Sequence, residues 1–153
     1  LLEARGFSAE DFALSHPGGS LGRRLLLQVS DVMHSGDRLP IVSTHTPLRE
    51  AIITISQKGL GMTAVTHPDN TLAGIFTDGD LRRVFDQASF DLQNTSIHKV
   101  MTKSPVVAKA NMLAAEALSL METRKINGLI VVNDANEPVG ALNMHDLLKA
   151  GVV

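Results

Sequence analysis

Two short stretches of the sequence pair a small polar residue with an aspartate three positions later. In GIFTDGDLRRVF (residues 74–85) the pair is Thr77 and Asp80, and in GALNMHDLLKA (residues 140–150) it is Asn143 and Asp146. We call these stretches the first and second exit motifs. The spacing is typical of a capping box, in which the polar residue is the N-cap of a helix and the acid its N3 residue. Because an apolar run precedes each pair, each motif predicts a strand that turns directly into a helix.

The chemistry available at such a point is the binding of phosphate and ribose groups. A helix N-terminus has unpaired backbone N–H groups and the positive end of the helix dipole, and both attract anions. A lone capping box has a purely structural alternative, since it only ends one element and starts the next. Two copies in matching contexts favour two equivalent binding sites.

The matching contexts come from an internal repeat. Met33 and Met101, each preceded by valine, are 68 residues apart, and from Ala51 onward the offset is 66 residues, as between Gly74 and Gly140. We assign the two-residue difference to the loop before the first long helix, where length is cheap to change. Each repeat reads as strand, helix, strand, turn, strand and helix.

The first long helix of each repeat is predicted from its cap and its apolar spacing. Thr46 as N-cap and Pro47 at N1 begin the first one, and the second begins at Asn111. Their apolar rows are Leu48, Ile52 and Ile55, and Leu113, Ala117 and Leu120. We expect these rows to form apolar faces at the edge of the module.

These elements define the predicted fold class, an α/β (α+β) protein of two β-α-β-β-α units related by a pseudo-twofold axis. The units are residues 30–90 and 96–153, and residues 1–29 form a linker arm. A unit of this size is marginally stable alone, so the two must share their buried surfaces.

Composition excludes several classes of function. The chain has no cysteine, tryptophan or tyrosine and a net charge of −2. Disulfides and thiolate zinc sites are therefore excluded. Stacking platforms for nucleic-acid bases are disfavoured, and no strong field favours nucleic acid or a membrane surface. No apolar run has the ~20 residues of a membrane span. We expect a cytoplasmic location and read the opening as the middle of a longer chain.

The order of elements, the Val-Met at each repeat start and G-x-x-[T/N]-x-x-D-L at each exit resemble a tandem pair of cystathionine-β-synthase (CBS) domains. The resemblance implies clefts between the units that bind adenosine-type ligands and other nucleotides. It implies that Thr77 and Asp80 contact ribose or phosphate, and that Met33 and Met101 face the cleft. The second motif departs from the pattern because Asn143 replaces threonine or serine, although Asp146 is kept.

A second resemblance covers the arm as well. FALSHPGGSLGRRLL followed by GIFTDGDLRR and MHDLLKAGVV resembles the C-terminal half of bacterial D-arabinose-5-phosphate isomerases. These enzymes carry a sugar-isomerase (SIS) domain before the CBS pair and supply synthesis of Kdo, an acid of lipopolysaccharide. The resemblance implies that His16 of SHPGG is catalytic in the intact isomerase. It also implies a dimer of CBS pairs and a tetramer of the parent.

The expected function is a regulatory nucleotide-sensing module that is not catalytic by itself. Its expected ligand is a nucleotide or nucleotide sugar, either CMP-Kdo or an adenine nucleotide, with no required cofactor and no metal. Basic residues could neutralise phosphates or simply be solvated: Arg82, Arg83, Lys103, Arg124 and Lys125. The alternative is a structural module that holds an oligomer together and binds nothing. An independent enzyme is disfavoured because no nucleophile–base set or P-loop is present.

Overall fold

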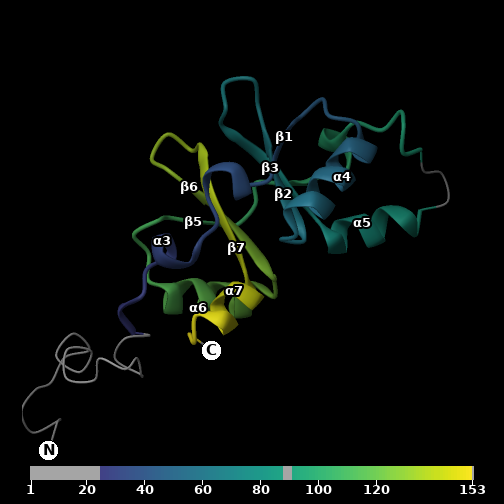
Figure 1. The fold of residues 1–153 in the computed structure, drawn as a ribbon. Coiled ribbons are helices and arrows are strands. Elements are labelled where there is room, and N and C mark those ends of the chain that lie inside the picture. The colour runs from purple at the N-terminus through teal and green to yellow at the C-terminus, as the bar shows by residue number, and fades with distance from the viewer. Residues whose placement is uncertain (1–24, 88–90, 153) are drawn as a thin grey trace, which may run out of the picture.

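Two copies of one β-α-β-β-α unit make up most of the molecule (Figure 1). The structure, a computed structural model, describes residues 25–87 and 91–152. The first repeat contains β1 (Ile41–Ser43), α4 (Leu48–Lys58), β2 (Met62–Thr66), β3 (Leu72–Thr77) and α5 (Asp78–Phe85). The second contains β5 (Val107–Ala108), α6 (Ala114–Arg124), β6 (Gly128–Val132), β7 (Pro138–Asn143) and α7 (Met144–Lys149). The predicted fold class and order of elements are confirmed.

The two sheets have the same pairing. In each, a short first strand runs parallel to the second, and the third returns antiparallel to it through a tight turn. Met62 pairs with Thr77 in the first sheet, and Gly128 with Asn143 in the second. All four positions obey the 66-residue offset, so the duplication holds at the level of individual pairs.

The segment that leads into each repeat packs on the other repeat. We call α3 (Val29–Val32) with Met33 and His34 the first entrance segment, and η3 (Ile97–Lys99) through β4 (Thr102–Lys103) the second. His34 bridges to Ala141 of β7, whereas β4 adds a strand beside β3. Figure 1 shows α3 beside α6 and β5, within the second repeat. The two repeats therefore complete each other's sheets.

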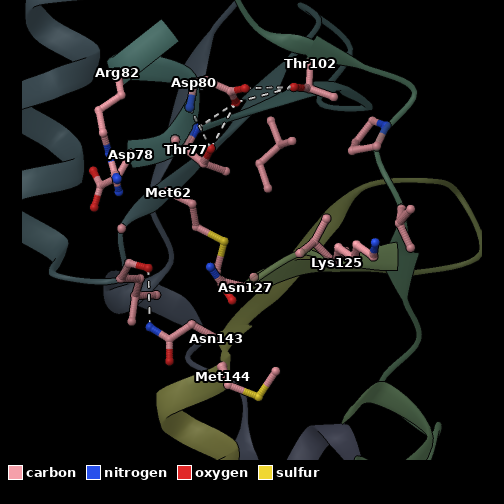
Figure 2. Close-up of a pocket in the computed structure, with 18 of the residues that line it drawn as sticks. Met62, Thr77, Asp78, Asp80, Arg82, Thr102, Lys125, Asn127, Asn143 and Met144 are labelled. Atoms are coloured by element: carbon pink, nitrogen blue, oxygen red, sulfur yellow. Dashed lines mark hydrogen bonds between the residues drawn. The ribbon is translucent and has the colours of Figure 1, made fainter. Parts of the chain in front are cut away.

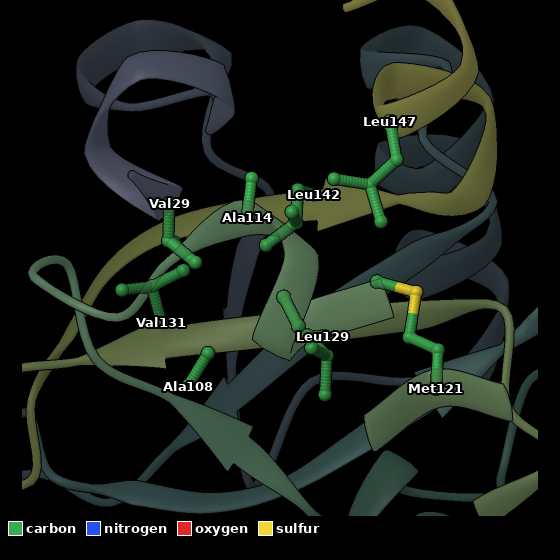
Figure 3. Packing of buried hydrophobic residues seen from close by; sticks show 9 residues of the cluster. Val29, Ala108, Ala114, Met121, Leu129, Val131, Leu142 and Leu147 are labelled. Carbon is green, nitrogen blue, oxygen red and sulfur yellow. The ribbon is translucent and has the colours of Figure 1, made fainter. Parts of the chain in front are cut away.

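Three apolar clusters follow from this exchange. The core of the second repeat includes Val29 of the first entrance segment together with Leu129, Leu142 and Leu147 (Figure 3). The core of the first repeat includes Ile97 of the second entrance segment. A third cluster joins the two sheets, and its members are Leu39, Met62, Ala64, Leu72, Ile75, Ile130, Val132 and Ala141. Each repeat thus shares buried surface with the other, as its small size requires.

The predicted starts of the two long helices are wrong. α4 begins at Leu48 with Pro47 as N-cap, and α6 begins at Ala114 with Leu113 as N-cap. The Leu48 N–H donates to the Thr95 carbonyl at 2.7 Å, and the Ala114 N–H to the Leu27 carbonyl at 2.8 Å. Backbone carbonyls just before the entrance segments therefore satisfy one of the N–H groups at each helix start that have no partner within the helix.

The predicted apolar rows are correct at Leu48, Ile55 and Ala117 and wrong at their other positions. The buried faces are Leu48, Ala51 and Ile55 on α4, and Ala114, Ala117 and Met121 on α6. Leu113, which the prediction placed in the second row, is 37% exposed at the N-cap. The expected apolar faces are in fact inside the repeats, and do not form an edge of the module.

The two-residue difference also lies elsewhere than predicted. Ile41 pairs with Ala64 and Val107 with Ile130, so the 66-residue offset already holds at the first strand of each repeat. The extra residues of the first repeat lie before β1, where η2 (Gly36–Arg38) forms a helical turn. Among residues 25–87 and 91–152, no helix is long and apolar enough to cross a bilayer.

Candidate functional site: a cleft between the repeats

A cleft of about 650 Å³ lies between the two repeats. Its walls come from the start of α5, the segment after β4, the connection from α6 to β6 and the start of α7. Figure 2 shows Thr77 and Asp80 on one side and Asn143 and Met144 on the other, with Met62 between them. Both exit motifs therefore contribute to one cleft. Its volume lies within the ~300–1,000 Å³ range of ligand pockets.

The first exit motif forms the predicted capping box. Thr77 is the N-cap of α5: its Oγ1 accepts a hydrogen bond from the Asp80 N–H at 3.1 Å. In return, Asp80 Oδ2 accepts from the Thr77 N–H at 3.0 Å and from its hydroxyl at 3.1 Å. Asp80 is only 5% exposed, although it is ionisable. A buried carboxylate requires such partners to offset its lost hydration.

Two further residues bind the Asp80 carboxylate. The Thr102 hydroxyl of β4 lies 3.2 Å from Oδ1 and 3.3 Å from Oδ2, as Figure 2 shows. The Arg83 guanidinium donates to Oδ1 from one turn further along α5. The Arg83 side chain is 72% exposed, so only its tip is fixed by this contact. Asp80 therefore connects the helix N-terminus, the exposed helix face and the second entrance segment.

The second exit motif repeats the cap but not these outer contacts. Asn143 Oδ1 accepts from the Asp146 N–H at 2.9 Å, and Asp146 Oδ2 accepts from the Asn143 N–H at 2.8 Å. The amide of Asn143 donates to the Leu60 carbonyl at 3.3 Å, across to the first repeat. Asp146 Oδ1 pairs with His34 Nε2 at 2.8 Å.

His34 and Thr102 occupy equivalent positions in the two repeats. They are 68 residues apart, and each contacts the aspartate of the opposite exit motif. Neither residue was predicted to belong to the site. The exchange of entrance segments places them there, and no local pattern in the sequence indicates that exchange. The one feature of the sequence that could have indicated them is their shared position, because each directly follows a Val-Met pair.

Charges line the cleft mainly on the side of the first repeat. Asp78, Arg82 and Arg83 come from α5, and Lys125 comes from the end of α6. The sequence analysis predicted Lys125 only as one of several basic candidates. Because α5 has just eight residues, Arg82 and Arg83 lie in its last turn, where the helix dipole favours positive charge. The lining also includes apolar Ile75 and Met62.

Not all predicted site residues line the cleft. Thr77, Asp80 and Asn143 do, whereas Asp146, Met33 and Met101 are outside its lining. The two methionines pack over the glycines of the opposite third strand, because a Cβ at Gly74 would lie 2.7 Å from Met101 Sδ and one at Gly140 would lie 2.4 Å from Met33 Sδ. His16 lies outside the described residues.

The remaining histidines form no metal cluster in the part of the chain that the structure describes. His45 and His98 lie edge to face, with ring centroids 6.1 Å apart, and His98 Nδ1 is 3.0 Å from the Thr44 carbonyl oxygen. His145 lines the cleft at the start of α7. The absence of a metal stays a prediction.

Comparison with known proteins supports both resemblances. Over all 153 residues the chain is 58% identical to arabinose 5-phosphate isomerase KdsD of Pseudomonas aeruginosa, and it spans 47% of that protein's length. The chain therefore covers about half of this relative. The predicted resemblance to arabinose-5-phosphate isomerases is confirmed.

Solved structures share the fold at low sequence identity. CBSX2 in complex with AMP matches 82% of this chain and 97% of its own with a TM-score of 0.72 and 21% identity. The CBS domain pair of protein MJ0100, in complex with 5′-methylthioadenosine and S-adenosyl-L-methionine, matches 81% and 94% with a TM-score of 0.73 and 18% identity. The CBS domain also matches residues 29–87 and 97–153. With two copies of this domain over most of its length, the chain belongs to the CBS-domain family.

Proposed function

We propose that this CBS pair is the regulatory, nucleotide-sensing module of an arabinose-5-phosphate isomerase. The observation that carries the proposal is the cleft between the repeats, which joins a capped helix N-terminus and a buried aspartate to several cations. Thr77 and Asp80 lie where α5 begins, and Arg82, Arg83 and Lys125 line the same space. These groups complement the hydroxyls and the phosphate of a nucleotide.

The size and polarity of the cleft support a ligand of this class. Its volume of about 650 Å³ would hold a mononucleotide or a nucleotide sugar. Ile75 and Met62 offer apolar surface on which a base could lie, whereas the charged groups lie toward α5. The related structures with AMP and with S-adenosyl-L-methionine support the same class of ligand.

Two ligands fit this chemistry. CMP-Kdo has a ribose, a phosphate and a carboxylate, which would engage Asp80, the start of α5 and the cations respectively. AMP or ATP supplies the first two features. A sensor in an isomerase that supplies Kdo synthesis would be most useful if it read the activated end product, and this favours CMP-Kdo. Asn143 would contact the ligand from the opposite wall, and Asp146 belongs to a second, weaker site.

The proposed parent isomerase interconverts D-ribulose 5-phosphate and D-arabinose 5-phosphate through a preceding SIS domain. In that enzyme His16 would act on the protons of the substrate, a role that histidine suits near neutral pH. We expect the purified chain of 153 residues to have no isomerase activity. Turnover that His16→Ala abolishes would contradict this expectation.

The test is calorimetric titration with CMP-Kdo, CMP, AMP and ATP, on the wild type and on Asp80→Ala. Loss of a hydrogen bond to a charged group weakens binding by about 1.5–3 kcal/mol, or roughly ten- to a hundredfold. Asp86→Ala is the matched control, since Asp86 lies exposed at the end of the same helix. Binding by Asp80→Ala as tight as that of the wild type would mean that the site has been misplaced.

A structural module that binds no ligand is the second candidate function. It is supported by exposed apolar side chains on the helices, with Ile53 of α4 45% exposed and Leu148 of α7 52% exposed. These replace the rows that the sequence analysis placed at the edge of the module. If none of the four nucleotides binds at millimolar concentration and light scattering shows a dimer that Leu148→Ser dissociates, this second function is the correct one.

A further inference from the structure

We infer that Arg83 and Thr102 form a latch on Asp80 that a ligand's hydroxyl groups must open, so that Arg83 opposes uncharged ligands and favours anionic ones. We define the latch as the contacts of Arg83 and Thr102 with the Asp80 carboxylate. The inference rests on the proposed function, because it concerns how a nucleotide enters the same cleft.

The Asp80 carboxylate has no unused acceptor position in this structure. Its Oδ2 accepts from the backbone and the hydroxyl of Thr77, and Oδ1 accepts from Arg83. The Thr102 hydroxyl is within 3.3 Å of both oxygens. A carboxylate offers about four lone-pair positions, and four donors fill them: the N–H and hydroxyl of Thr77, the guanidinium of Arg83 and the hydroxyl of Thr102. A ribose hydroxyl can therefore bind Asp80 only after one of the present donors leaves.

The donors differ in how easily they can leave. The Thr77 contacts are part of the helix cap and hold the start of α5. Arg83 in contrast is 72% exposed, so its guanidinium can move into solvent without disturbing the packing of the helix. Thr102 lies on a strand of two residues, which pairs with Gly74 and Ile75 of β3. Arg83 and Thr102 are therefore the donors that a ligand would displace.

Displacement of Arg83 has opposite consequences for two kinds of ligand. When a nucleoside takes its place on Asp80, the guanidinium loses a charge-assisted hydrogen bond and gains none from the ligand. When a nucleotide takes its place, the phosphate enters a cleft that Arg83 also lines and can pair with the released guanidinium. The latch thus selects for a ligand that carries both hydroxyls and an anionic group.

Arg82 provides a matched control. It directly precedes Arg83 in α5, is also exposed, carries the same charge and also lines the cleft. Asp80 accepts no hydrogen bond from it among the contacts of the described residues. A change that acts only through the net charge of the cleft should therefore appear equally in Arg82→Gln and Arg83→Gln.

The experiment measures the dissociation constants of AMP, adenosine, CMP and cytidine for the wild type, Arg83→Gln and Arg82→Gln. Of adenosine and cytidine, one will bind the wild type more tightly. Relative to the wild type, we expect Arg83→Gln to bind that nucleoside roughly three- to tenfold more tightly and the corresponding nucleotide about tenfold more weakly. Arg82→Gln should weaken the nucleotide less than Arg83→Gln does, and it should not tighten binding of the nucleoside. Thr102→Val, which loosens the latch without altering charge, should tighten both ligands by roughly two- to fivefold.

Each outcome separates the latch from the proposed function. If the wild type binds a nucleotide but Arg83→Gln weakens nucleoside and nucleotide alike, or leaves the nucleoside unchanged, the latch is wrong and the proposed function stands. If the wild type binds none of these four probes, and neither CMP-Kdo nor ATP, at millimolar concentration, both are wrong. Thermal unfolding of each variant establishes that it is folded, which the exposure of Arg83 leads us to expect.

Discussion

The two exit motifs build the same helix cap and surround it with different chemistry. In both, a small polar N-cap and an aspartate at N3 exchange hydrogen bonds with each other's backbone N–H. Around Asp80 the outer donors are a hydroxyl and a guanidinium, whereas around Asp146 the outer partner is the His34 imidazole. The duplicated fold fixes the cap, and residues from elsewhere in the chain decide what the aspartate binds.

The residues that follow each cap also differ in charge. The first motif has Asp78, Arg82 and Arg83 where the second has Met144, Leu148 and Lys149. The first motif is thus suited to a charged ligand, and the second offers apolar surface. This difference explains why one cleft has charges mainly on one wall.

The largest expected contrast comes from removing the charge of each aspartate. Asp80→Asn should lower the free energy of unfolding by about 2–3 kcal/mol, because it places an amide against Arg83 and Thr102. Asp146→Asn should lower it by only about 1 kcal/mol, since an amide can still hydrogen bond to an imidazole. Urea unfolding measures both. Equal losses in the two variants would contradict the prediction, because Arg83 and Thr102 would then stabilise Asp80 no more than His34 stabilises Asp146.

The next contrast concerns the glycines of the third strands. A Cβ at Gly74 would meet the backbone carbonyl oxygen of Thr102 at 2.6 Å, whereas at Gly140 the nearest atom is the flexible Met33 Sδ at 2.4 Å and the His34 carbonyl oxygen is 3.3 Å away. Gly74→Ala should destabilise by about 2 kcal/mol and Gly140→Ala by about 1 kcal/mol or less. A larger loss at Gly140 in thermal unfolding would contradict this ranking.

A smaller contrast lies at the ends of the two long helices. Gly59 and Lys125 are the C-caps of α4 and α6, with φ of 73° and 56°, in the left-handed region. Gly59→Ala should destabilise by about 1 kcal/mol, and Lys125→Gly should stabilise by about 0.5 kcal/mol. The same Lys125→Gly change should weaken nucleotide binding in calorimetry. A variant that is both more stable and tighter-binding would remove Lys125 from the site.

The smallest expected effect separates the two hairpin turns by pH. Hydrogen bonds from the Thr71 hydroxyl, and then from its backbone N–H, lower the pKa of Asp69 in the first turn. In the second turn the acceptor is the uncharged side-chain amide of Asn133, whose Oδ1 accepts from the backbone N–H groups of Ala135 and Glu137. Because folding lowers the pKa of Asp69, its contribution to stability is present above the unfolded value of 3.8 and is lost as the pH falls through the folded value.

In Asp69→Asn, the free energy of unfolding should therefore fall less steeply below about pH 4 than in the wild type. The turn itself should persist, since asparagine retains the acceptor oxygen. Urea unfolding of the wild type and the variant between pH 3 and 7 measures this. A wild-type curve identical to that of the variant over this range would contradict the assignment.

The duplicated order of elements was predictable because it depends on local patterns. Strand pairs, hairpin turns and both capping boxes follow from apolar runs, turn residues and the Thr77–Asp80 and Asn143–Asp146 spacings. The starts of α4 and α6 were not predictable from caps, because carbonyls of Thr95 and Leu27 satisfy their first N–H groups. A partner from a distant segment leaves no mark at the helix start itself.

The outer contacts of the aspartates were unpredictable for a related reason. Arg83 could be placed near Asp80 from their three-residue separation on a helix. Thr102 and His34 come from entrance segments that cross to the other repeat, and His34 is 112 residues from its partner Asp146. Such pairings depend on how the two repeats assemble, and periodicity within one repeat contains no information about them.

The crossing of the entrance segments also has a consequence for synthesis on the ribosome. His34 emerges long before Asp146, the residue 112 positions later with which it pairs. At typical elongation rates this interval is roughly 6–20 s, much longer than a hairpin takes to form. During that time Val29, Met33 and His34 have no second repeat to pack against. A nascent chain stopped after the first repeat should therefore remain sensitive to proteases at this segment, and gain resistance only when the second repeat is released.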